Sequence, residues 1–251
     1  MMPHDRDGKH RHPAGDRKAT RPQARHGHAD AGVFVTGTDT GVGKTIVAVG
    51  LLRALVRAGF RACGMKPVAA GCDASGVNAD VIALEAAGNV DAPLAERNPY
   101  AFAEPVAPHL AAEATGRPIE LAAIARAYAC LRARADVLVV EGAGGALVPL
   151  DARHDMLDVA AALSLPVLLV VGMRLGCLNH ALLTALAVQR RGLELCGWIA
   201  NELPPGMPLL AQNVDTLARR LGLPPVAVLP PGAGTLGADA LVKLRFLRSP
   251  H

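Results

Sequence analysis

Short runs of apolar residues alternate along the chain with segments long enough to form helices. The apolar runs, rich in Val, Leu and Ile, predict strands at 32–36, 61–66, 137–141, 166–171, 195–200 and 226–229. The segments between them predict helices at 43–58, 78–87, 118–134, 155–163, 179–191 and 208–221. Near-continuous apolar strands are typical of a parallel sheet covered on both faces. The alternation therefore predicts an α/β fold, with helices on both faces of a parallel sheet.

The first 31 residues differ in composition from the rest of the chain. They contain five Arg and two Lys against four Asp, which accounts for +3 of the formal net charge of +4. Their few apolar residues and five histidines predict a solvated, disordered tail, with weak metal binding as the alternative. Residues 32–251, which show no repeat and no linker, are expected to form a single domain. This domain is close to neutral, so the sequence gives no support for nucleic-acid binding.

No apolar stretch reaches the length that a membrane-spanning helix requires. The most apolar run, at 163–173, is short and contains Pro166, which favours a buried strand. The five cysteines are scattered, and no pair has the spacing of metal ligands. Reduced thiols of this kind are typical of a cytoplasmic protein, and we expect no membrane partner.

A glycine-rich turn follows the first predicted strand and leads directly into the first predicted helix. Its sequence is Gly37-Thr38-Asp39-Thr40-Gly41-Val42-Gly43-Lys44-Thr45. Strand, glycine turn, Lys-Thr pair and helix together are typical of a phosphate-binding loop. Backbone N–H groups of the turn would face the phosphates, Lys44 would reach the β- and γ-phosphates, and the Thr45 hydroxyl would bind Mg²⁺. The spacing is unusual, because Gly37 and Gly43 enclose five residues where the standard pattern has four.

Polar residues also stand where two other predicted strands end, and in the segment that follows one of them. Lys66 precedes Pro67, which cannot continue a sheet ladder, and Glu141 is followed by glycines. Because ligands of such sheets bind beyond the carboxyl ends of the strands, Lys66, Asp80 and Glu141 are candidate site residues. An acid in the position of Glu141 can face a metal ion at the phosphate loop. The alternatives are a surface lysine, a helix cap at Asp80 and a solvated carboxylate.

In the C-terminal half of the chain, two further candidate sites follow predicted strands. Asn201 offers a donor and an acceptor, which suits the edge of an adenine ring, although an ordinary turn is the alternative. The segment Leu175-Gly176-Cys177-Leu178-Asn179-His180 opens a helix whose free N–H groups would hold a carboxylate. Here the alternative is a plain helix cap formed by Asn179.

Taken in order, these segments resemble the dethiobiotin synthetases, and the resemblance covers residues 32 to about 230. The phosphate loop has the five-residue spacing of that family. The other matching segments are Lys66-Pro67-Val68, Asn98-Pro99-Tyr100 with Phe102 and Glu104-Pro105, Pro108-His109, Val140-Glu141-Gly142-Ala143-Gly144-Gly145, Gly176 to Ala181, and Gly197-Trp198-Ile199-Ala200-Asn201.

The resemblance implies an ATP- and Mg²⁺-dependent ligase of biotin synthesis. Its reaction joins CO2 to 7,8-diaminononanoate and closes a cyclic urea, through a carbamate and a carbamic-phosphoric anhydride. It also implies a homodimer, in which the start of the 176–179 helix binds the substrate carboxylate across the interface. Lys44 and Lys66 take the catalytic roles, and Thr45, Asp80 and Glu141 hold the metal. The implied nucleotide contacts are Thr40, Gly41, Val42, Gly43, Lys44, Thr45, Asp80, Glu141, Gly142, Ala143, Gly144, Asn201, Glu202 and Pro230, and the implied substrate contacts are Ala70, Gly176, Cys177, Leu178 and Asn179.

The chain departs from the family pattern at three places. Ala70 stands where many relatives have a serine that contacts substrate, the region after Pro231 matches poorly, and the N-terminal tail has no counterpart. Two other functions share the phosphate loop. One is another ATP-dependent ligase. The other is a switch ATPase of the ParA/MinD type, which usually carries a second lysine early in the loop, where this chain has Thr38 and Asp39.

Overall fold

The computed structural model describes residues 32–232, 236 and 238–244. All six predicted strands are present and form one sheet in the order β2-β5-β1-β6-β7-β8, with every pairing parallel. Their bounds are β1 Gly32–Gly37, β2 Ala62–Met65, β5 Val137–Glu141, β6 Val167–Met173, β7 Leu195–Glu202 and β8 Ala227–Leu229. The expected α/β architecture is therefore confirmed. The predicted tail at 1–31 lies outside the described residues.

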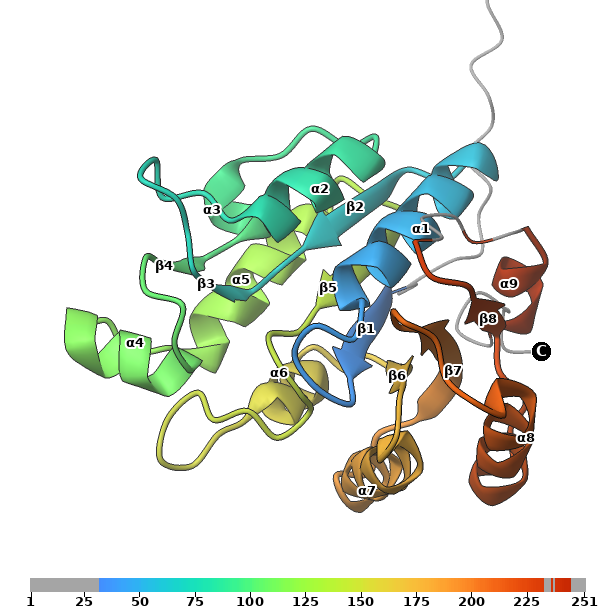
Figure 1. The fold of residues 1–251 in the computed structure, drawn as a ribbon. Helices are drawn as coiled ribbons and strands as arrows, with labels where there is room; N and C mark the ends of the chain where they lie inside the picture. Colours follow the sequence, from blue (N-terminus) through green and yellow to red (C-terminus); the bar gives the residue numbers. More distant parts are fainter. Residues whose placement is uncertain (1–31, 233–235, 237, 245–251) are drawn as a thin grey trace, which may run out of the picture.

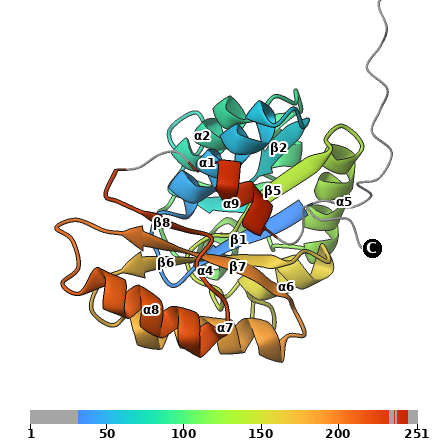
Figure 2. The same ribbon diagram turned by 90° about the vertical axis from the view of Figure 1, so that its right-hand side faces the viewer.

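The six predicted helices are also present. They are α1 Lys44–Arg57, α2 Ala79–Ala87, α5 Leu121–Arg132, α6 Met156–Ala162, α7 Cys177–Arg190 and α8 Leu210–Leu221. Helices α1 and α2 lie on one face of the sheet together with a short additional helix, α9 (Ala238–Lys243), whereas α7 and α8 lie on the other (Figures 1 and 2). Helices α5 and α6 also cover this second face, because they pack with Phe34 and Val167.

Alternating side chains of the central strand explain why both faces must be covered. Val33 and Val35 of β1 pack into the core beneath α1, whereas Phe34, between them, packs into the core beneath α5 and α6. All three side chains have 0% of their surface exposed. Because both faces of the strand are buried here, the side chains at these three positions are all apolar, whichever face they point to, and they show no alternation of polar and apolar residues.

The sequence pattern did not predict five elements of the described chain. They are β3 Val68–Ala70 and β4 Tyr100–Phe102, which pair in parallel as a second small sheet, and the helices α3 Leu94–Arg97, α4 Pro108–Thr115 and α9. Figure 1 shows β3, β4 and α4 at the end of the molecule away from β8. Strands of three residues are too short for a period of two to be recognised.

The start of α7 differs from the prediction by two residues. The helix begins at Cys177, and its N-cap is Gly176, which has a φ of 95° in the left-handed region. Glycine adopts this conformation without steric cost. Asn179 therefore lies inside the first turn, and the alternative that it caps the helix is wrong.

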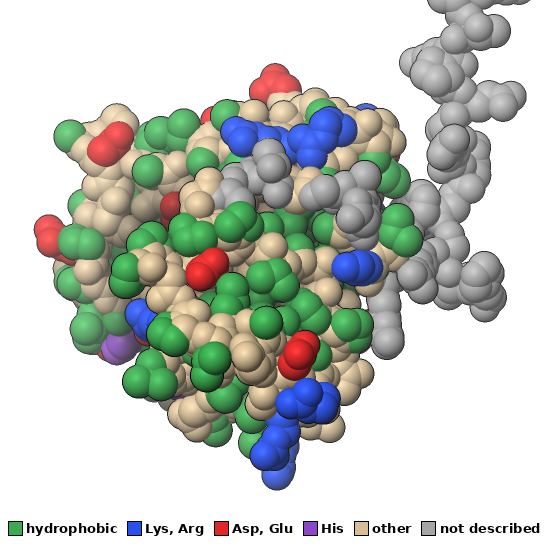
Figure 3. Space-filling view, turned by 45° about the vertical axis from the view of Figure 1, so that its right-hand side comes forward, with side chains coloured by type: hydrophobic (Ala, Val, Ile, Leu, Met, Phe, Trp, Pro, Cys, Tyr) green, Lys and Arg blue, Asp and Glu red, His purple; other side chains and the backbone are tan. Residues whose placement is uncertain are grey.

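On one face of the molecule, charged side chains are not gathered in a single area (Figure 3). On the face in Figure 3, Lys and Arg side chains form small separate groups around a largely apolar centre. Among the described residues, no helix is long and apolar enough to cross a membrane.

Candidate active site

The glycine turn after β1 is held in shape from both of its sides. Gly43 has a φ of 93°, and a Cβ there would lie 2.3 Å from the Asn201 Nδ2 atom, so only glycine fits. The Nδ2 of Asn201, on β7, donates a hydrogen bond of 2.9 Å to the carbonyl of Val42. On the other side, Arg174 forms an ion pair of 2.5 Å with the Asp39 carboxylate. The bond from Asn201 thus ties the loop backbone to β7, and the ion pair adds a contact on the opposite side.

Lys44 is the first residue of α1 and lies almost entirely inside the protein. Only 7% of its surface is exposed, and its Nζ donates to the Asp39 carbonyl at 2.9 Å. Burial lowers the pKa of Lys44 from its usual value, and the negative charge of Glu141 offsets only part of that effect. The ammonium group is therefore held within the loop, where it can exchange a carbonyl partner for an anion.

The sheet register brings Lys66 and Glu141 together. Met65 of β2 pairs with Val140 of β5, so the residues that follow them lie side by side where the two strands end. Glu141 also pairs with Val35 of β1, the strand that leads into the glycine turn. The carboxyl ends of three neighbouring strands thus deliver the Lys66 ammonium, the Glu141 carboxylate and the loop to one place.

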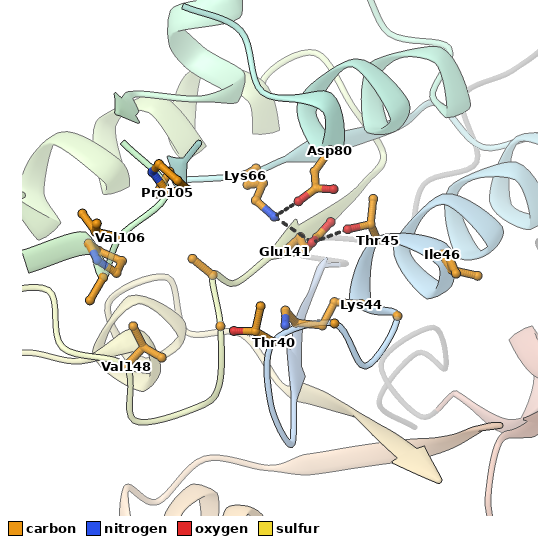
Figure 4. Close-up of a pocket in the computed structure, with 17 residues that line it drawn as sticks. Thr40, Lys44, Thr45, Ile46, Lys66, Asp80, Pro105, Val106, Glu141 and Val148 are labelled. Carbon is orange, nitrogen blue, oxygen red and sulfur yellow. Dashed lines mark hydrogen bonds and ion pairs between the residues drawn. The ribbon is translucent and has the colours of Figure 1, made fainter. Parts of the chain in front are cut away.

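Lys66 and Glu141 form a hydrogen-bonded cluster with Asp80 and Thr45 (Figure 4). The Lys66 Nζ donates to the Asp80 Oδ2 at 2.5 Å and to the Glu141 Oε1 at 2.8 Å. The Thr45 hydroxyl, one residue after Lys44, donates to the same Glu141 oxygen at 2.8 Å. Asp80 is not the cap of α2, because the Asn78 side chain caps that helix and accepts from the Asp80 N–H. The Asp80 carboxylate can therefore face the cluster.

The three charged groups of the cluster differ in their proton affinities. Burial raises the pKa of Glu141, which has 1% of its surface exposed, even though Lys66 lies beside it. Burial opposes the charge of Lys66, but Glu141 and Asp80 outweigh it and raise the pKa of that lysine. Burial likewise opposes ionisation of Asp80, yet the Lys66 charge outweighs it, so the pKa of Asp80 is lowered. The lysine and the outer carboxylate are consequently charged at neutral pH.

The donor set around Glu141 fits a hard divalent cation. The Glu141 Oε2 atom is buried and is without a hydrogen-bond partner among the described residues. Buried carboxylate oxygens without partners are costly, and a bound cation would satisfy this one. The Thr45 hydroxyl and the Asp80 carboxylate supply two further oxygens, the ligand type that Mg²⁺ prefers. Thr45, Asp80 and Glu141 are thus suitably placed to hold this metal ion.

The cluster and the loop open into a cavity of about 690 Å³. Thr40, Gly41, Gly43, Lys44 and Thr45 line it on the loop side, together with Lys66, Asp80, Glu141, Ala143 and Gly144. Ala70, at the end of β3, also lines the cavity and contributes only a methyl group where a serine would contribute a hydroxyl. The wall formed by Pro105, Val106 and Val148 was not assigned to the site from the sequence, because apolar loop residues carry no chemical signal (Figure 4).

Other predicted site residues lie outside this cavity. Gly176, Cys177, Leu178 and Asn179 are at the start of α7 and do not line it. Glu202 directly follows Asn201 at the end of β7, and Pro230 follows β8, the strand farthest from β2 in the sheet. Val42 and Gly142 have packing roles, since Val42 is buried and a Cβ on Gly142 would lie 2.9 Å from the Phe34 ring.

Comparisons with known proteins agree with this geometry. A family model described as an AAA domain matches residues 31–248. The ATP-dependent dethiobiotin synthetase of Nitrosospira multiformis is 51% identical over 79% of this chain and 88% of its own. The enzyme of that name from Aromatoleum aromaticum is 49% identical over 85% of this chain and 96% of its own.

Among solved structures, the septum site-determining protein MinD of Pyrococcus horikoshii, complexed with Mg-ADP, has a TM-score of 0.54. It is 15% identical and covers 86% of this chain and 87% of its own, a likeness that shows the fold alone. The sequence relatives decide between the functions that share this fold. This chain belongs to the family of the ATP-dependent dethiobiotin synthetases, ligases of biotin synthesis.

Proposed function

We propose that this protein closes the cyclic urea of dethiobiotin from 7,8-diaminononanoate, CO2 and ATP. One amine of the substrate adds to CO2 and forms a carbamate. A carbamate oxygen attacks the γ-phosphorus, ADP leaves, and a carbamic-phosphoric anhydride results. The second amine then attacks the carbonyl carbon and expels phosphate. The observation that carries the proposal is the buried Lys66, which faces the same cavity as the phosphate loop.

The two buried lysines divide the charges of this reaction between them. Lys44, within the loop, is placed to counter the charge of the β- and γ-phosphates as the γ-phosphoryl group is transferred. Lys66 is placed to hold the carbamate and to counter the charge that moves onto the anhydride. Such reactions depend on alignment and charge compensation more than on covalent chemistry by the protein. Pro105, Val106 and Val148 line the same cavity and give it an apolar wall.

Thr45, Asp80 and Glu141 would hold Mg²⁺ in this site. When bound, the metal neutralises phosphate charge and orients the β- and γ-phosphates. Glu141 is the central ligand of this proposal, because its Oε2 has no other partner among the described residues. Lys66, which donates to both carboxylates, holds the two groups beside each other.

The adenine of ATP is proposed to lie near Asn201, with Glu202 and Pro230 beside it. Asn201 is next to the phosphate loop, since its side chain bonds to Val42. That bond uses one hydrogen of the Nδ2 group, and the side-chain oxygen is left for the base. Asn201 would thus join the base site to the phosphate site.

The substrate carboxylate is proposed to bind at the start of α7 of a second subunit. Helix N-termini favour anions, through free N–H groups and the helix dipole. The α7 start does not line the cavity of its own chain, and Leu175 beside it has 98% of its surface exposed. A homodimer that covers this segment would complete the site.

The five cysteines are free thiols, which supports a cytoplasmic location.

Replacing Asn179 by Asp tests this carboxylate site. Asn179 is exposed in the first turn of α7, where a negative charge favours the helix, so the melting temperature should not fall. The same charge should repel the substrate carboxylate and raise the KM for the diamine roughly 10- to 100-fold, the size of a charged hydrogen bond. ATP affinity should be unchanged. Steady-state kinetics and nucleotide titration measure both quantities.

Mixed dimers show which subunit supplies the helix. One subunit would carry Lys44→Ala and the other Asn179→Asp. If the carboxylate site crosses the interface, one composite site has both changes and the other has neither, so about half of the activity survives. Activity no higher than that of the single variants would mean that each site lies within one chain, contrary to the proposal.

The anhydride itself is tested by the fate of oxygen. With CO2 labelled by oxygen-18, a carbamate oxygen should appear in the released phosphate, because that atom bridges carbon and phosphorus in the anhydride. Mass spectrometry of phosphate formed in unlabelled water measures it. Phosphate without label, formed together with dethiobiotin, would refute the anhydride.

A further inference from the structure

The segment Asn98-Pro99-Tyr100 belongs to the matched sequence pattern, yet none of its residues lines the cavity. It links α3 to β4, next to the end of β2. Only 6% of the Asn98 surface is exposed, which is unusual for an amide side chain. A buried amide must be satisfied by partners, and these partners indicate what Asn98 does.

The backbone carbonyl of Lys66 is bonded to this segment, and its backbone N–H is bonded to Arg97, the residue before the segment. The Lys66 N–H donates to the carbonyl of Arg97 at 2.8 Å. The Lys66 carbonyl accepts a hydrogen bond of 2.6 Å from the Asn98 Nδ2. Pro67 follows and has no N–H, so the pairing of β2 with β5 ends at Met65 and supplies neither partner. The two residues Arg97 and Asn98 therefore replace the sheet ladder at the position of the lysine.

Asn98 is itself firmly held. Its Nδ2 also donates to the Tyr100 carbonyl at 3.1 Å, and its backbone N–H donates to the Leu94 carbonyl at 2.8 Å. Both side-chain partners are carbonyl oxygens, so the amide can bond to them only with its NH2 group. The Tyr100 N–H in turn donates to the Pro67 carbonyl at 3.1 Å, on the other side of the lysine.

We propose that Asn98 is a positioning residue for Lys66, which fixes the lysine backbone at the point where β2 ends, so that Nζ reaches both carboxylates and the reacting carbamate. The inference rests on the role given to Lys66 in the proposed function. Asn98 does not line the cavity, so it is not expected to touch substrate. It acts by donating a hydrogen bond to the backbone carbonyl of Lys66, which has no donor from the sheet.

Asn98→Ala is expected to lower kcat by about 10- to 100-fold, the scale of a small misplacement of a catalytic group. ATP affinity should stay within about twofold of the unmodified protein, because Lys44 and the loop are not altered. If Asn98 had a purely structural role, Asn98→Ala would instead lower the stability of the protein, and it would change kcat and ATP affinity together or leave both unchanged. Should Asn98→Ala fail to fold, Asn98→Ser, whose hydroxyl retains one donor, takes its place with a smaller expected loss.

Asn89 offers a matched control at the other end of the same strand. Its side chain, which is more exposed than that of Asn98, accepts from the Ala62 N–H at 2.9 Å and donates to the Phe60 carbonyl at 3.1 Å, so it holds the chain where β2 begins. Asn89→Ala should lower the melting temperature and leave kcat unchanged, since Lys66 stands at the opposite end. A kcat loss as large as that of Asn98→Ala would overturn the inference.

A double-mutant cycle with Lys66→Ala completes the test. If Asn98 acts through Lys66, adding Asn98→Ala to Lys66→Ala should change kcat by less than about twofold. Independent, multiplying losses would overturn the inference, as would a normal kcat in Asn98→Ala beside a slow Lys66→Ala. A normal kcat in Lys66→Ala would overturn the proposed role of Lys66 as well.

Discussion

Lys44→Ala is expected to lower turnover by at least about 10²-fold, the usual cost of removing one preorganised electrostatic donor. The side chain is buried within the loop and its Nζ has only the Asp39 carbonyl as a hydrogen-bond partner among the described residues. No other loop residue carries a positive charge that could replace it. Steady-state rates of ADP formation, with both co-substrates saturating, measure the loss.

Arg53→Ala is the control for this change. Arg53 is exposed on the same helix and does not line the cavity, so its loss removes an equal charge without altering the site. The pH dependence adds a second criterion. Because burial lowers the pKa of Lys44, ATP affinity of the free enzyme should fall as the pH rises through that lowered value. Lys44→Ala should bind ATP weakly without this alkaline decrease, and a near-normal kcat/KM would refute the loop assignment.

Glu141→Gln is expected to raise the Mg²⁺ concentration required for half-maximal activity by at least about tenfold. The amide keeps the shape of the side chain and its bonds to Thr45 and Lys66, but it removes the charge and one metal-binding oxygen. Activity measured against free Mg²⁺ gives the shift. Glu113→Gln, on the exposed surface of α4, serves as the control and should behave as the unmodified protein does.

Stability should respond differently from activity. Burial raises the pKa of Glu141, so the folded protein disfavours the ionised carboxylate. The resulting loss of stability grows as the pH rises from the pKa of this group in the unfolded chain toward its higher pKa in the folded protein. The amide of glutamine does not ionise, so it makes no such contribution to the pH dependence of stability. In metal-free buffer, the melting temperature of the unmodified protein should therefore fall relative to that of Glu141→Gln as the pH rises through this range. An unchanged Mg²⁺ dependence would show that Glu141 is not a metal ligand.

The parallel sheet was predictable because strands buried on both faces are continuous apolar runs, as β1 and β6 show. The phosphate loop was predictable because glycine, lysine and threonine are each required by its chemistry. Lys66 and Glu141 were found by their position at strand ends. Their contact was not predictable, because it depends on the order β2-β5-β1 and on the pairing of Met65 with Val140.

Other features left no recognisable signal. Strands β3 and β4 have three residues each, and their pairing joins segments about thirty positions apart. The ion pair between Arg174 and Asp39 joins exposed residues from two distant loops. Asn98 was noted in the sequence only as part of a matched pattern, since an asparagine between a short helix and a strand is typical of an ordinary turn. Its bond to Lys66 became visible only in three dimensions.

In the proposed function, the phosphate loop and the Lys66 cluster serve one coupled reaction. The most direct test is phosphate release from ATP and Mg²⁺, measured with and without 7,8-diaminononanoate and bicarbonate. Release should require both co-substrates and should yield one phosphate for each dethiobiotin formed. An ATPase rate that is the same in their absence would contradict the account and would indicate a switch ATPase.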